Sequence, residues 1–75
     1  MEISVEYPDL ENEGYQIYLD DFLTYKQVEK MRAGMSPEML ADYDLQGTPG
    51  EDDSHFLNMS NEETFIYLRD FLLTL

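Results

Sequence analysis

Apolar and polar residues alternate in two stretches near the start of the chain. Residues 3–7 and 15–19 place an apolar side chain at every second position, and residues 8–14 between them are rich in turn-forming types. Such alternation is typical of a strand with one buried face and one solvated face. The pattern therefore predicts a β-hairpin whose turn is centred near Glu11 and whose outer face is exposed to solvent.

Two helices are expected after the hairpin. Thr24 and Gln27 have the spacing of a capping box, and apolar residues then recur at helical intervals, so the first helix should run to the next glycine. The pair Ser36 and Pro37 is typical of an N-cap and a first helical position. It predicts a second, short helix that ends by Gln46, before a loop rich in glycine and proline.

The last third of the chain predicts a further helix and leaves one segment open. Residues 54–59 form a third strand or an irregular segment, because the adjacent apolar pair Phe56 and Leu57 obscures the alternation. Ser60 and Glu63 have capping-box spacing and predict a helix that runs to the C-terminus. The main apolar side of that helix should contain Phe65, Leu68, Phe71, Leu72 and Leu75.

With residues 54–59 counted as a strand, the predicted order of elements is ββααβα. That order indicates an α+β domain in which the helices pack on one face of the sheet. The chain has 75 residues, of which 43% are hydrophobic and 13% aromatic, so it should fold as one domain, residues 1–75, despite its charge. It contains no cysteine and no apolar stretch long enough for a signal peptide or a membrane span. We therefore expect a cytoplasmic protein with no disulfide and no membrane contact.

The formal net charge of −13 is the strongest indication of function. Residues 1–24 hold seven acids and no base, residues 36–63 hold eight acids and no base, and the segment between them carries Lys26, Lys30 and Arg32. The acidic residues therefore belong to the folded domain and not to a disordered tail. Like charges at this density oppose folding and strengthen association with cations, so the sequence predicts a basic protein partner.

The first acidic block lies on the outer face of the predicted hairpin. The register implied by the turn pairs Glu2 with Asp20 and Ser4 with Tyr18, and like charges across a ladder are unfavourable. On this face the ring of Tyr18 is suited to anchor an interface. The alternative is a solvated face that keeps an edge strand from aggregating. With the second block included, the predicted partner-binding residues are Glu2, Glu6, Tyr18, Asp20, Asp21, Asp42, Asp44, Glu51, Asp52 and Asp53.

The second acidic block also approaches the spacing of a calcium-binding loop. Asp42, Asp44, Gly47 and Asp53 have the matching spacing, but three residues depart from the pattern: Gln46, Pro49, and Asp53, which is shorter than the usual bidentate Glu. Acid-rich chains produce such matches by chance. We therefore expect no metal ion and no cofactor, and a solvated loop that extends the acidic surface.

Catalytic chemistry has few candidate residues in this chain. There is one histidine, His55, and there is no cysteine, no glycine-rich phosphate cradle and no nucleophile elbow. Direct binding of nucleic acid is disfavoured as well, because four bases cannot offset seventeen acids against a polyanion. The sequence therefore predicts a binding protein that is not an enzyme.

Two classes of binding protein fit these features. The first binds and inhibits a nucleic-acid-binding protein by presenting a DNA-like array of carboxylates. In size and charge the chain is similar to small phage-encoded inhibitors of restriction enzymes, CRISPR effectors, repair enzymes and polymerase, a likeness of composition without a shared motif. That likeness implies a viral protein that acts as a DNA mimic.

The second class is an adaptor or dimeric regulatory module that binds through an apolar helix face. Ile66 and Leu73 lie together on the last helix, away from its main apolar stripe. They either pack under the hairpin or a loop, or form a seam for a homodimer or another partner. Ionic strength separates the two classes, because salt weakens contacts between exposed charges and leaves apolar contacts in place.

Overall fold

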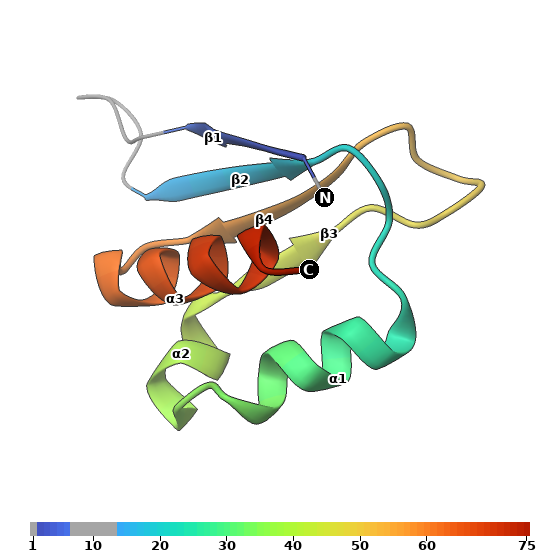
Figure 1. The fold of residues 1–75 in the computed structure, drawn as a ribbon. Coiled ribbons are helices and arrows are strands. Elements are labelled where there is room, and N and C mark those ends of the chain that lie inside the picture. The colour runs from blue at the N-terminus through green and yellow to red at the C-terminus, as the bar shows by residue number, and fades with distance from the viewer. Residues whose placement is uncertain (1, 7–13) are drawn as a thin grey trace.

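Four strands and three helices make up the structure, a computed structural model that describes residues 2–6 and 14–75. The strands form one antiparallel sheet in the order β1-β2-β4-β3, and α3 lies across it (Figure 1). The predicted α+β class is confirmed, but the order of elements is ββααββα and not ββααβα. In chain order the elements are β1 (Ile3–Glu6), β2 (Tyr15–Leu19), α1 (Tyr25–Ala33), α2 (Pro37–Asp42), β3 (Asp44–Gln46), β4 (His55–Met59) and α3 (Glu62–Leu73).

The pairing of the predicted hairpin is confirmed. In the antiparallel β1–β2 ladder Ser4 lies opposite Tyr18, and the backbone N–H of Asp20 donates to the carbonyl oxygen of Glu2 at 3.3 Å. The predicted turn covers residues 8–14, and all of it except Gly14 lies outside the described residues. Burial specifies the register, because a slip by one residue would turn the fully buried Ile17 toward solvent.

The second half of the sheet combines a predicted strand with an unexpected one. The strand predicted within residues 54–59 is confirmed as β4. The prediction that the second helix ends by Gln46 is confirmed, because α2 ends at Asp42. The strand β3 that follows was not predicted. Three residues are too few to show an alternation, so this strand depends on its pairing with β4, where Leu45 lies opposite Leu57.

The predicted starts of the first two helices are confirmed. In α1 the Thr24 hydroxyl oxygen accepts from the backbone N–H of Gln27 at 3.2 Å, and the Gln27 side-chain oxygen accepts from the Thr24 N–H at 2.8 Å. In α2 the Ser36 hydroxyl oxygen accepts from the Met39 N–H at 3.2 Å. Each bond satisfies a donor that the first turn of a helix leaves unpaired, so these local sequences are sufficient to start the helices.

The predicted start of α3 is wrong. No capping box forms between Ser60 and Glu63, because the helix begins one residue later, and its N-cap residue Asn61 makes no side-chain capping bond. The backbone N–H groups before the helix donate instead to the carboxylate of Asp42, a residue distant in sequence. The helix also ends before Leu75, which is 39% exposed and does not extend the buried stripe.

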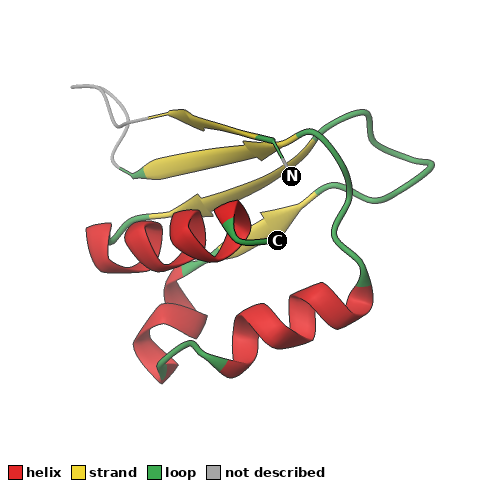
Figure 2. Ribbon diagram, viewed as in Figure 1, coloured by secondary structure: helices red, strands yellow, loops and turns green. Residues whose placement is uncertain are grey.

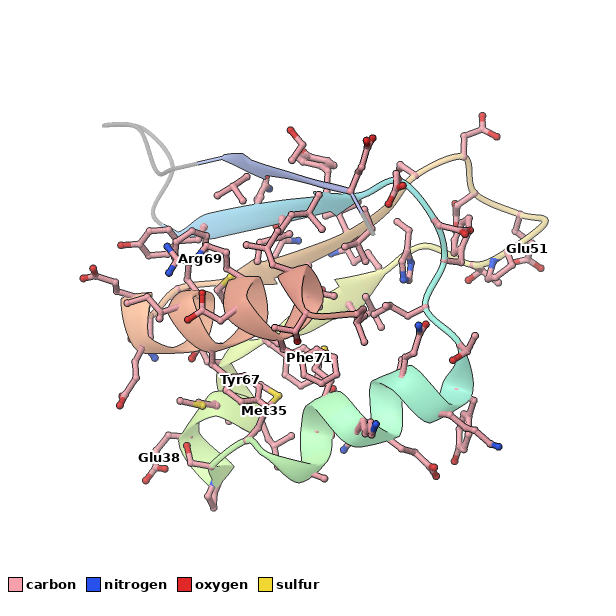
Figure 3. All side chains as sticks on the ribbon, viewed as in Figure 1. Met35, Glu38, Glu51, Tyr67, Arg69 and Phe71 are labelled. Carbon is pink, nitrogen blue, oxygen red and sulfur yellow. The ribbon has the colours of Figure 1, made fainter. Side chains whose placement is uncertain are left out.

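The helices pack on one face of the sheet. The Tyr67 hydroxyl of α3 donates to the carbonyl oxygen of Met31 in α1 at 2.8 Å, and Tyr67 lies between the two helices in Figure 3. Strand residues that alternate with the buried positions point to the other side of the sheet, which no described helix covers. We call this uncovered side the open face. The hydrophobic core lies on the opposite side of the sheet and includes the buried residues Ile17, Met31, Leu57, Leu68 and Leu72. Met39 and Leu40 of α2 are partly buried and pack against it.

Candidate functional site

Residues from both acidic blocks of the sequence lie at one end of the sheet. Leu19, at the end of β2, pairs with Ile3 of β1 and with His55 of β4. The residues next to these positions therefore leave the sheet at the same end, where the loop after β2 and the loop between β3 and β4 also lie (Figure 2). We call this region the acidic end and define it by Glu2, Asp20, Asp21, Glu51, Asp52 and Asp53.

The carboxylates of the acidic end are exposed and carry uncompensated charge. All of them are exposed, and the ion pair found within residues 2–6 and 14–75 joins Arg69 to Asp70 of α3 at 3.0 Å. Arg69 lies toward the opposite end of the sheet from Glu51 (Figure 3). The negative potential at the acidic end is therefore available to act on a partner.

The basic side chains of the central segment occupy a different element. Lys26, Lys30 and Arg32 are exposed on α1, which lies on the helix side of the sheet (Figure 1). The open face and the acidic end carry none of these three bases. Within the described ranges none of these three bases forms an ion pair with a carboxylate of the acidic end.

Two aromatic rings lie on the open face beside the acidic end. Tyr18 of β2 and Phe56 of β4 are opposite each other in the ladder, with ring centroids 5.3 Å apart and an interplanar angle of 32°. The Tyr18 hydroxyl donates to the side-chain oxygen of Gln16 at 2.9 Å. The predicted position of Tyr18 on the outer face is confirmed. Its neighbour Phe56 was not predicted, because the adjacent Leu57 hides the strand period in the sequence.

An open pocket lies between Tyr18 and the acidic end. Ser4 and Tyr18 belong to the open face, because they alternate with residues on the core side, and Glu2 and Asp20 follow directly at the ends of β1 and β2. The pocket is therefore bordered by two acidic residues, by Ser4 and by Tyr18, with Ile3 and Leu19 of the core side beside them. Its lining residues are Glu2, Ile3, Ser4, Tyr18, Leu19 and Asp20.

Other predicted partner-binding residues lie away from this region. Asp44 is exposed at the start of β3, opposite Asn58 and away from the acidic end. Its carboxylate accepts a hydrogen bond from the Gln46 side-chain amide at 2.7 Å. The side chain of Glu6 is outside the described part of the molecule. The spacing of the calcium loop is interrupted by β3, and the described residues contain no group of three or more His, Cys, Asp or Glu side chains that could hold a metal ion.

The carboxylate of Asp42 has a structural role at the start of α3. It accepts hydrogen bonds from the backbone N–H of Ser60 at 3.1 Å and of Asn61 at 3.0 Å. Burial raises the pKa of this carboxyl, but the hydrogen bonds from Asn61, Ser60 and the Thr64 side chain together outweigh burial and hold the pKa below its ordinary value. The charge also faces the positive end of the α3 dipole. Asp42 therefore replaces the missing local cap.

Asp42→Asn should lower the free energy of unfolding by about 0.5–2 kcal/mol at neutral pH, because it removes the charge that the start of α3 binds. The native pKa is lowered, so this contribution is complete above the unfolded-state pKa and is lost as the pH falls through the native pKa. Urea unfolding of both chains should therefore show a difference that shrinks in acid. Asp44→Asn is the control and should change stability by less than about 0.5 kcal/mol. A difference that persists in acid would contradict a role based on charge.

Ile66 and Leu73 lie on the outer side of α3. Their exposed fractions are 40% and 59%, so the prediction that they pack under the hairpin or a loop is wrong. The alternative, that they form a seam for a second copy or another partner, stays a prediction.

His55 is the first residue of β4, and its side chain is buried. Its Nε2 accepts from the backbone N–H of Leu23 at 3.4 Å, and its ring packs against Phe22 with centroids 4.6 Å apart. Its Nδ1 is buried without a hydrogen-bond partner in the described part of the chain. These contacts attach the segment after β2 to the sheet, on the side opposite the open face.

The fold and this surface define an acidic α+β domain whose open sheet face adjoins a cluster of uncompensated carboxylates. Comparison of the chain with protein-family models, with curated proteins and with solved structures found no match. None of the helices in the described ranges has both the length and the apolar content needed to cross a membrane.

Proposed function

We propose that this protein binds a basic nucleic-acid-binding protein and inhibits it by presenting the acidic end in place of nucleic acid. The observation that carries the proposal is the convergence of exposed carboxylates, from segments distant in the sequence, at one end of the sheet. One DNA strand carries about six phosphates over about 20 Å of the helix axis. The acidic end offers a similar number of anionic groups.

The folded scaffold supports this use of charge. The Asp21 carboxylate accepts from the Phe22 N–H at 2.9 Å, and the Asp52 carboxylate accepts from the Thr48 N–H at 2.9 Å. Carboxylates that are already held in place lose less conformational entropy when a partner binds than those of a flexible tail. The proposed inhibition is competition for a basic cleft, so it needs no catalysis and no cofactor, and we place it in the cytoplasm.

Affinity capture in a salt gradient tests the proposal. The immobilised chain should retain a nucleic-acid-binding protein from cell lysate at low ionic strength and release it below about 0.5 M salt, because salt screens exposed charges. Added nucleic acid should elute the same protein, since both ligands would use one cleft. A target that stays bound at high salt and is not displaced by nucleic acid would contradict the proposal. It would favour binding through the side of α3 that carries Ile66 and Leu73.

A further inference from the structure

We propose that the open pocket beside the acidic end receives an arginine side chain of the protein partner. The guanidinium group would stack on the ring of Tyr18 and pair with the carboxylates of Glu2 and Asp20. This inference rests on the proposed function and specifies the chemistry of its contact.

The Tyr18 ring packs against an aromatic ring on one side and has a small neighbour on the other. On the β4 side it packs against Phe56 with centroids 5.3 Å apart, and its hydroxyl is bonded to Gln16 at 2.9 Å. On the β1 side its cross-strand neighbour is Ser4, whose side chain is too small to cover a phenol ring. The pocket lies on this side, because Ser4 and Tyr18 both line it. Tyr18 is partly exposed and therefore borders the pocket with its ring held on the β4 side.

Two carboxylates border the same pocket. The hydrogen bond from the Asp20 N–H to the Glu2 carbonyl oxygen, at 3.3 Å, places these residues side by side across the ladder. Opposite residues in an antiparallel ladder have Cβ atoms about 4.5–5.5 Å apart, and like charges there are unfavourable. A cation between the two carboxylates relieves that repulsion, so charge complementarity favours a basic occupant.

Arginine matches these groups better than lysine does. Its guanidinium group is planar and weakly hydrated, stacks on aromatic rings and donates hydrogen bonds in a fork that suits carboxylates. The lysine ammonium group is compact and strongly hydrated, so it gains less from the ring. The pocket should therefore select arginine from the basic residues of a nucleic-acid-binding surface.

Titration of the intact chain with basic peptides tests this inference. Peptides of about ten arginines or about ten lysines carry equal charge, and calorimetry at low and moderate salt compares their affinities. The arginine peptide should bind about tenfold more tightly. Ser4→Leu fills the pocket without changing charge and should reduce the ratio of affinities to about one. Ser60→Leu makes the same exchange at an exposed position after the other end of β4 and should leave the ratio unchanged.

A measurement on the unaltered chain keeps the test independent of the folding of the variants. The arginine peptide should shift the NMR resonances of the Tyr18 ring more than the lysine peptide, because a stacked guanidinium contacts the ring directly. Equal affinities, or an arginine preference that Ser4→Leu leaves intact, overturn the arginine pocket. The proposed function survives those outcomes if salt still releases both peptides. If neither peptide binds, the pocket and the proposed function are both overturned.

Discussion

Reversing one carboxylate from each acidic block, as Asp20→Lys with Glu51→Lys, should weaken binding of the captured target about 10- to 100-fold at low salt. Both side chains are exposed, and neither makes a hydrogen bond or ion pair within the described ranges, so the change acts through charge. Each reversal adds two units to the net charge of −13. Self-repulsion therefore falls, and the free energy of unfolding should stay equal or rise by less than about 0.5 kcal/mol.

Glu29→Lys with Glu38→Lys is the matched control for this charge reversal. It makes the same change in net charge at exposed residues of α1 and α2, and Glu38 lies on the other side of the molecule from Glu51 (Figure 3). Its effect on target binding, measured by surface plasmon resonance at several salt concentrations, should stay within about threefold. Equal losses in both variants would show that net charge alone governs binding. No loss in either would remove the proposed function.

Leu68→Ala should lower the free energy of unfolding by about 2–5 kcal/mol. The Leu68 side chain has no exposed surface and belongs to the buried cluster between α3 and the sheet, so its truncation leaves a cavity. Small domains have only about 0.05–0.15 kcal/mol of stability per residue, so this loss is a large part of the total. The Tm should fall by about 4–8 °C for each kcal/mol lost.

Leu73→Ala in the same helix is the control for burial. The exchange is identical, but Leu73 is the last residue of α3 and its side chain is 59% exposed. Its free energy of unfolding should change by less than about 0.5 kcal/mol in urea unfolding followed by circular dichroism. Similar losses in the two variants would mean that α3 packs through a different face.

Sequence patterns were sufficient for features that depend on near neighbours in the chain. The hairpin register was predictable because alternation shows which residues of each strand face inward, and Ser4 does lie opposite Tyr18. The starts of α1 and α2 were predictable because a capping hydrogen bond joins residues three positions apart, as from Gln27 to Thr24. The α+β class follows from such local features.

Features that join distant segments could not be predicted in this way. The three-residue strand β3 exists through its pairing with β4, and no pattern within residues 44–46 indicates it. The start of α3 depends on Asp42, whose carboxylate takes the place of the expected Ser60 cap. Exposure of Ile66 and Leu73 was equally undecided, because helical spacing shows which residues share a side and not whether another element covers it.

The surplus of acid and its division into two blocks follow from residue types alone, since each ionised carboxylate carries its charge in any fold. The assembly of those blocks into one surface is a property of the folded sheet. Leu19 pairs with both Ile3 and His55, and this brings Asp20 and Asp53 to the same end. That pairing is maintained by the burial of Ile17 against Leu57 in a shared core, a contact between residues far apart in the chain that no local pattern encodes.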